Sequence, residues 1–215
     1  MLRIAIDGAC RRNGKPDCVS AGGVFVQHHD RSLVFSVSEK QSTNQRGEML
    51  ALIKALGYVS WVLEDAQIIT DSEYLFNAAQ NEWAKRWANN DWRTASGEIA
   101  KNKDLWQQIF NITKFIEDRG VEVSYYHIKG HCISFGKVKA TNALDWCNDG
   151  SFLYAAVRDK YDNDKELKAD NLEAAQILSQ KNNGFRLPND LLKDFVVLNT
   201  VADAIATREV ENADR

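Results

Sequence analysis

Three acidic residues stand where their side chains can converge on one point. Asp7 ends an apolar run, so its carboxylate is expected at the end or the centre of a strand, and Asp71 ends a short β-branched run, so its carboxylate is expected at the C-terminal edge of a strand. Glu48 lies in a segment whose apolar residues recur at helical spacing. Acids supplied by two strands and one helix predict a crevice above a sheet, where open α/β proteins usually hold ligands. With Asp145 as a fourth acid further along the chain, the oxygen donors suit two magnesium ions.

The hydrophobic pattern also predicts the elements around these acids. Strands are expected at about 2–7, 22–29, 31–38, 66–70 and 121–127. Helices are expected at about 44–63, 103–119, 167–178 and 191–205, with further helical segments between 72 and 90. Three meandering strands followed by alternating helices and strands indicate an α/β fold, in which helices flank a mixed sheet. A charged connector is expected at 159–165 and a frayed tail at 209–215.

The amino-acid composition limits which classes of protein this chain can belong to. The 215 residues are 44% hydrophobic, which is enough for a buried core in one domain plus an extension. A net charge of −3 argues against broad coating of nucleic acid, so a polyanion would need a local basic patch or a metal. The four cysteines form no C-x-x-C pair, and reduced thiols are expected. No apolar run approaches the ~20 residues of a membrane span and no secretion signal is visible, so we expect a cytoplasmic protein without membrane contact.

Several short motifs occur in order along the chain, and together they resemble a type 1 ribonuclease H of the bacterial kind. They are Ile6-Asp7-Gly8-Ala9-Cys10, Thr43-Asn44-Gln45-Arg46-Gly47-Glu48-Met49, Ile69-Thr70-Asp71-Ser72, Lys129-Gly130-His131, Trp83-Ala84-Lys85-Arg86-Trp87, Asp91-Trp92-Arg93-Thr94 and Lys101-Asn102-Lys103-Asp104-Leu105-Trp106. The resemblance implies a ribonuclease H-like fold, an α/β fold with a five-stranded mixed sheet flanked by helices. It covers a catalytic domain at 1–158, with a basic protrusion called the handle at about 80–103, and leaves a helical extension at 159–215 unexplained.

The resemblance also implies an activity. It predicts a metal-dependent endonuclease that hydrolyses the RNA strand of RNA–DNA hybrids and leaves 5′-phosphate and 3′-hydroxyl ends. Two Mg²⁺ ions would serve this reaction, with Mn²⁺ as an alternative metal. By the same resemblance Asp7 bridges the ions, while Glu48 and Asp71 bind the ion on the leaving-group side. Asp145 binds the ion on the nucleophile side, and His131 shuttles a proton or assists product release.

The fourth carboxylate has two candidates in the sequence. In the family the last aspartate usually lies closer to the loop histidine than the fourteen residues that separate His131 from Asp145. An insertion within 132–140 would account for the extra length. Asp149 is the alternative ligand, because it lies one helical turn beyond Asp145 and can share its helix face.

Recognition of an RNA strand requires contacts to its 2′-hydroxyl groups, which DNA lacks. The resemblance assigns these contacts to polar groups near the acids, namely the backbone of Cys10, Asn44, Gln45, and Ser72 or Glu73. Thr43 would hold a DNA phosphate and can cap a helix at the same time. Aromatic and basic side chains that suit sugars and phosphates alternate in the handle: Trp83, Lys85, Arg86, Trp87, Trp92 and Arg93. A small aromatic core that stiffens the handle is the alternative role of Trp83, Trp87 and Trp106.

Other functions stay open at this point. A structure-selective DNase or exonuclease with the same fold is one alternative. A hybrid-binding module without catalysis is another, because the fourth acid is displaced. The amphipathic helix at 191–205 is expected to pack on the nuclease core, and a surface for a protein partner or for self-association is the alternative.

Overall fold

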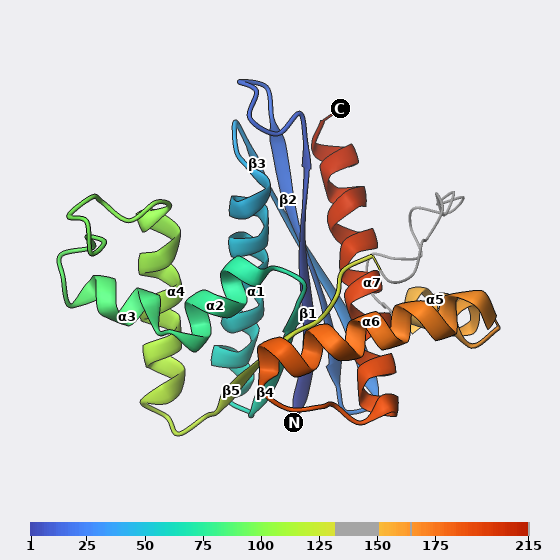
Figure 1. Cartoon of the computed structure of the whole chain (residues 1–215). Helices are drawn as coiled ribbons and strands as arrows, with labels where there is room; N and C mark the ends of the chain where they lie inside the picture. The colour runs from blue at the N-terminus through green and yellow to red at the C-terminus, as the bar shows by residue number, and fades with distance from the viewer. Residues whose placement is uncertain (132–150, 164, 215) are drawn as a thin grey trace.

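A five-stranded mixed sheet forms the centre of the computed structural model, which describes residues 1–131, 151–163 and 165–214 (Figure 1). The strands lie in the order β3-β2-β1-β4-β5. Their bounds are β1 (Leu2–Arg11), β2 (Val19–His28), β3 (Arg31–Lys40), β4 (Ala66–Thr70) and β5 (Val123–His127). The first three strands form an antiparallel meander, whereas β4 and β5 run parallel to β1. The predicted fold class is therefore confirmed.

Alternation of side chains along β1 divides the interior into two cores. Leu2, Ile4 and Ile6 belong to the first core, and Ala5 belongs to the second. Four helices pack around the first core: α1 (Asn44–Val62), α2 (Glu73–Gln80), α3 (Trp83–Ala88) and α4 (Lys103–Glu117). Asp7 shares the parity of Ala5 along the strand, so its side chain points to the second face of the sheet.

The second face is covered by the C-terminal part of the chain. Its helices are α5 (Ser151–Asn163), α6 (Lys165–Asn183) and α7 (Asn189–Ala213). Figure 1 shows α7 lying along β1 and β2 on the side opposite α1. The apolar side of α7 is buried there through Leu192, Phe195, Leu198, Val201 and Ile205. The helix predicted at 191–205 thus packs on the central sheet, and this side of it is not available to a partner.

A glycine allows α7 to approach the sheet closely. Gly23 of β2 faces the helix, and a Cβ atom at this position would overlap the backbone of Ala202 and Ala206. Such an overlap cannot be relieved by rotating a side chain, because both neighbours are backbone atoms of a helix. The position of α7 over the central strands therefore depends on a residue without a side chain.

Two expectations about the C-terminal region are wrong. Residues 159–163 belong to α5 rather than to a connector, and Arg158 ties this helix to Asp194 of α7. The tail does not fray at residue 209, because α7 continues to Ala213. Asp214 forms ion pairs with Arg11 and Arg12 at the end of β1. These charge pairs hold the last turn of α7 against the hairpin of β1 and β2.

Cys10 and Cys18 form a disulfide across the β1–β2 hairpin, whereas reduced thiols were expected. A separation of 8 residues conceals their proximity, because only the antiparallel pairing of the two strands brings the side chains together.

Among the helices of the described ranges, none has both the length and the apolar composition required to cross a membrane.

Candidate active site

Asp7 lies in the middle of β1 and is only 5% exposed. The backbone N–H of Gly8 donates a hydrogen bond to Asp7 Oδ1 at 2.6 Å. Across the hairpin Asp7 pairs with Gly23, the residue on which α7 packs. The carboxylate of Asp7 is thus held between the central strands and the C-terminal helix.

Glu48 reaches the same region of the sheet from α1. The helix begins after Thr43, whose side chain accepts a hydrogen bond from the N–H of Arg46, so the predicted N-cap is confirmed. Asn44 Nδ2 donates to one oxygen of Glu48 at 3.0 Å, and Ser72 Oγ donates to the other. A Cβ on Gly8 would lie 2.6 Å from Glu48 Cγ. Asp7 therefore supplies one acid, and the absence of a side chain at Gly8 leaves room for the side chain of Glu48.

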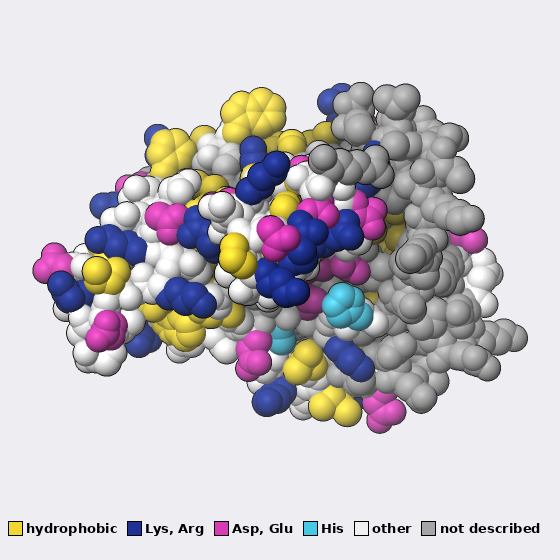
Figure 2. All heavy atoms as spheres, turned by 90° about the horizontal axis from the view of Figure 1, so that it is seen from above, with side chains coloured by type: hydrophobic (Ala, Val, Ile, Leu, Met, Phe, Trp, Pro, Cys, Tyr) yellow, Lys and Arg dark blue, Asp and Glu magenta, His cyan; other side chains and the backbone are white. Residues whose placement is uncertain are grey.

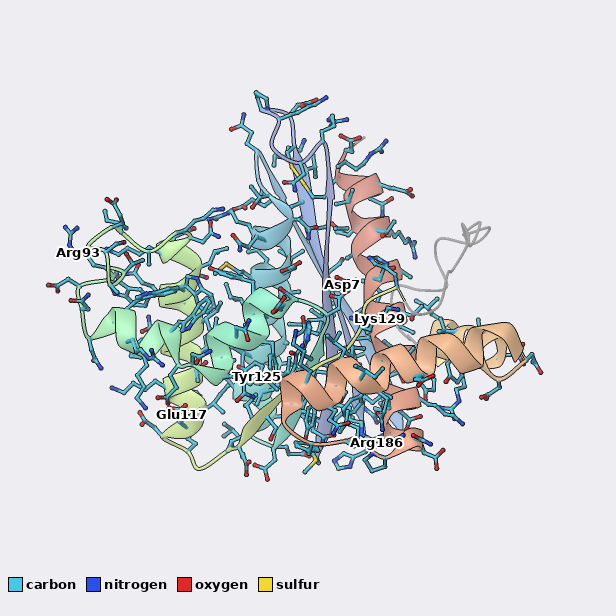
Figure 3. The ribbon with its side chains drawn as sticks, in the orientation of Figure 1. Asp7, Arg93, Glu117, Tyr125, Lys129 and Arg186 are labelled. Carbon is cyan, nitrogen blue, oxygen red and sulfur yellow. A yellow bond between two sulfur atoms is a disulfide. The ribbon has the colours of Figure 1, made fainter. Side chains whose placement is uncertain are left out.

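Asp71 follows β4 directly, and Ser72 then caps α2. The backbone oxygen of Asp71 lies 3.0 Å from His127 Nε2, at the end of the neighbouring strand β5. A Cβ on Gly130 would overlap the carboxylate of Asp71. The Lys129-Gly130-His131 segment consequently passes directly over this acid, and Figure 3 labels Lys129 on this segment.

Asp203 is a fourth acid at this place, and the sequence analysis missed it. It comes from α7, next to Ala202, which lies over Gly23. Its charge raises the pKa of Asp7 more than the charge of Glu48 does, and it also raises the pKa of Asp71. One signal was available, because Asp203 falls four residues after the buried Asn199 on a mainly apolar helix side.

Burial, together with electrostatic repulsion, raises the pKa values of these carboxylates. Burial raises the pKa of Asp7 well above its usual value, and the charges of Asp71, Asp203 and Glu48 add to the effect. Burial, with the charge of Asp71, raises the pKa of Glu48 to about 7. Burial also raises the pKa of Asp71, although His131 lowers it in part. Acids that repel one another in this way form a site suited to divalent cations.

Comparison with known proteins identifies the family. The sequence pattern of the RNase H family matches residues 2–143, well over half of the chain. The chain belongs to the ribonuclease H family. Ribonuclease H of Francisella tularensis subsp. novicida (strain U112) is 37% identical over 134 residues, which are 62% of this chain and 82% of that protein. Ribonuclease H of Legionella pneumophila (strain Lens) is 32% identical over 130 residues, 60% of this chain and 84% of that protein.

A solved structure shows the same fold. LC9-RNase H1, a type 1 RNase H with the type 2 active-site motif, superposes with a TM-score of 0.51 at 24% identity. The superposition covers 60% of this chain and 63% of that one. The resemblance to type 1 ribonucleases H is confirmed, and the chain is a nuclease and a hydrolase of a family that generally depends on divalent metals. The family pattern ends before α5, so α7 and Asp203 lie outside it.

The remaining predicted catalytic residues of this ribonuclease H are placed only in part. Asp145 and Asp149 lie outside the described residues, and the prediction that one of them is the fourth ligand stays a prediction. The side chain of His131 is 78% exposed, and its Nδ1 lies 3.6 Å from Asp203 Oδ2. The backbone of His131 is in the left-handed region with φ of 54°. The loop histidine is therefore at the border between the acids and solvent.

The polar residues predicted to contact RNA lie around Glu48. Asn44 and Ser72 both donate hydrogen bonds to its carboxylate. Gln45 Oε1 accepts a hydrogen bond from Asn102 Nδ2 at 3.4 Å, which joins the start of α1 to the residue before α4. Cys10 lies further along β1, where it pairs with Ser20 and carries the disulfide. Asn44 and Ser72 are thus the candidates most closely coupled to the acids.

The handle tryptophans pack on one another rather than facing solvent together. The ring of Trp87 lies 5.8 Å from that of Trp83 and 5.6 Å from that of Trp106. Trp92 meets Phe110 of α4 at 6.1 Å. The alternative of a small aromatic core is therefore confirmed for Trp83, Trp87 and Trp106, and contact of these rings with nucleic acid stays a prediction.

The basic side chains of the handle point outward. Lys85, Arg86 and Arg93 are exposed. Lys85 forms an ion pair with Glu82, and Arg93 donates to the carbonyl oxygen of Gly97. Figure 3 shows Arg93 at the outer end of the handle, away from Asp7. Figure 2 shows the end of the molecule seen from above, where acidic and basic side chains lie together near the middle of the surface, with a histidine beside them.

Proposed function

We propose that this enzyme cleaves the RNA strand of RNA–DNA hybrids at internal positions, using Mg²⁺ and leaving 5′-phosphate and 3′-hydroxyl ends. The observation that carries the proposal is the meeting of Asp7, Glu48, Asp71 and Asp203 beside the middle of β1 and the C-terminal end of β4. The similarity to bacterial ribonucleases H supports the choice of substrate. We keep the cytoplasmic location as a prediction from the sequence.

The four acids fit a magnesium site. Mg²⁺ takes oxygen ligands, and its positive charge would favour the ionised forms that burial and mutual repulsion disfavour in Asp7, Glu48 and Asp71, whose pKa values are raised. Asp7 is the proposed bridging ligand, because it interacts with all three other carboxylates. Bound ions would activate the attacking water and neutralise the leaving 3′-oxygen, and Mn²⁺ is an alternative metal. We propose Asp203 as the fourth ligand, with Asp145 and Asp149 as the alternatives.

Residues around the acids have roles of their own. Asn44 and Ser72 orient the carboxylate of Glu48, and the same residues are proposed to contact the 2′-hydroxyl of the RNA strand. One set of hydrogen bonds would therefore couple recognition of RNA to the geometry of the acids. His131 Nδ1, beside Asp203 and open to solvent, is proposed to carry a proton between the site and bulk water.

The substrate comparison that tests this function uses one sequence in three forms. An end-labelled RNA–DNA hybrid, the RNA duplex and the DNA duplex are incubated with the enzyme in Mg²⁺ or in EDTA. Cleavage of the hybrid alone, at internal positions and only with metal, is expected. Preferential cleavage of the DNA duplex would favour the DNase or exonuclease alternative. Tight binding of the hybrid without turnover would favour the non-catalytic module.

Substrate binding by the handle is expected to depend on its exposed cations. Lys85→Ala combined with Arg86→Ala should raise KM for the hybrid several-fold and leave kcat nearly unchanged, because these side chains would bind remote phosphates. The slope of log kcat/KM against log salt concentration should fall by up to about 2, near one for each lost phosphate contact. Steady-state kinetics over a range of KCl concentrations measures both effects.

A charge-matched control separates the handle from net charge. Arg31→Ala combined with Arg119→Ala removes two exposed cations, one from the first residue of β3 and one from the residues after α4. This control should keep the KM and the salt slope of the wild type. Equal effects of the two double variants would remove the handle from the binding surface.

A further inference from the structure

A second cluster of potential metal ligands lies far from the catalytic acids. His28 is the last residue of β2, His29 lies in the turn to β3, and Glu64 follows the end of α1. Since Asp7 pairs with Gly23, five residues of β2 separate the level of Asp7 from His28, a distance of about 17 Å along the strand. This cluster is therefore not part of the active site.

The turn explains why two adjacent histidines face the same point. Successive side chains of a strand point to opposite faces, but His29 leaves the strand with a left-handed φ of 53°. The two rings consequently lie together, with centroids 4.5 Å apart. Glu64 meets them from the other side, because the helix before it ends at Leu63 in a left-handed conformation. Two loops thus present three ligands to one another.

The two distances from Glu64 to the histidine nitrogens are close to the ligand spacing of a tetrahedral metal site. One ligand atom from each residue lies within 4.8 Å of the others. Glu64 Oε1 is 3.0 Å from His28 Nε2 and 3.5 Å from His29 Nε2. Tetrahedral zinc with bonds of about 2.0–2.1 Å places its ligands about 3.3 Å apart, between these two values. The second oxygen of Glu64 faces the amino group of Met1 at 3.8 Å, which leaves Oε1 to the histidines.

The ring of His28 is held by a third residue. Tyr58 Oη lies 2.7 Å from His28 Nδ1, the nitrogen that faces away from Glu64. An N–H at Nδ1 that donates to this hydroxyl would leave the lone pair at Nε2, which is the usual arrangement for a histidine that binds a metal. Tyr58 comes from α1 and packs on Phe35 of β3, with ring centroids 5.6 Å apart. The position of the ligand is therefore supported by the core.

We infer that His28, His29 and Glu64 bind one transition metal ion, with Zn²⁺ as the best fit, at the end of the sheet opposite the active site. Two imidazole nitrogens and one carboxylate oxygen suit zinc, and His29 is 67% exposed, so water can take the fourth position. The ion would join the β2–β3 turn to the loop after α1. It would stabilise the fold without taking part in catalysis.

Zinc binding by the 215-residue chain without a histidine tag tests this inference. Isothermal titration with ZnCl₂ in excess Mg²⁺, which occupies the carboxylate site, should give one zinc ion per chain. His29→Gln and Glu64→Gln should each weaken zinc binding at least about tenfold. Circular dichroism verifies that both variants fold. Tyr58→Phe should weaken binding to a smaller extent, since it loses only the hydrogen bond that orients His28.

A control and two outcomes make the test decisive. Asp7→Asn changes the catalytic site and should bind zinc as the wild type does. Equal zinc affinity in wild type, His29→Gln and Glu64→Gln would overturn the inference, and so would the absence of binding by the wild type at millimolar zinc. Neither outcome bears on hybrid cleavage, which the substrate comparison measures separately.

Discussion

Asp203→Asn is expected to lower the rate of hybrid cleavage roughly a hundredfold, the usual scale for loss of one preorganised electrostatic group at a reacting centre. Asp203 reaches the site from α7 and acts electrostatically on both Asp7 and Asp71. Loss of its charge should also reduce repulsion in the metal-free protein, so Tm measured in EDTA should stay equal or rise. Single-turnover cleavage and thermal unfolding measure the two effects.

Three further neutral substitutions locate the fourth ligand. Asp145→Asn and Asp149→Asn test the positions expected from the sequence. Asp190→Asn is the matched control on α7, because this side chain is 99% exposed and lies near the start of the helix. If Asp203→Asn cleaves at the wild-type rate while Asp145→Asn or Asp149→Asn does not, the fourth ligand lies at one of those two positions.

Gly23→Ala is expected to destabilise the protein by at least about 3 kcal/mol, the upper end for overpacking a core. The added Cβ would overlap backbone atoms of Ala202 and Ala206, so α7 would have to move away from β2. For a chain of this size such a loss corresponds to a fall in Tm of about 6–12 °C. Thermal unfolding followed by circular dichroism measures it.

A second glycine provides the control for this substitution. Gly57 lies in α1, and a Cβ there would meet nothing within 4 Å. Gly57→Ala should therefore stabilise the helix by about 0.5–1 kcal/mol, because alanine loses less backbone freedom than glycine. A Gly23→Ala variant as stable as the wild type would mean that α7 does not lie against β2. The placement of Asp203 beside Asp7 would then be wrong as well.

The sequence predicts the parts of the site that local patterns specify. Asp7 and Asp71 end apolar runs, and Glu48 lies in a periodic helix, so the element that carries each acid can be inferred from its neighbours. The same periodicity predicts the sheet and the buried side of α7, both of which are confirmed. These features depend on spacings of two to four residues, which a single sequence displays directly.

Other features depend on long-range packing and could not be inferred in this way. Asp203 joins the other acids only because α7 crosses β2 at Gly23. Asp203 and Gly23 are 180 positions apart in the sequence. The direction of the handle tryptophans depends on their contacts with α4 and on one another. The disulfide depends on the pairing of β1 with β2. In each case a contact between residues far apart in the sequence decides the placement.

The most direct test of the proposed site is cleavage of an end-labelled RNA–DNA hybrid in Mg²⁺ by the wild type and by Asp7→Asn. Asp7 interacts with all three other acids, so its neutral variant should lose cleavage and still bind the hybrid with a Kd close to that of the wild type. Cleavage by Asp7→Asn at the wild-type rate would contradict a metal site at these four carboxylates.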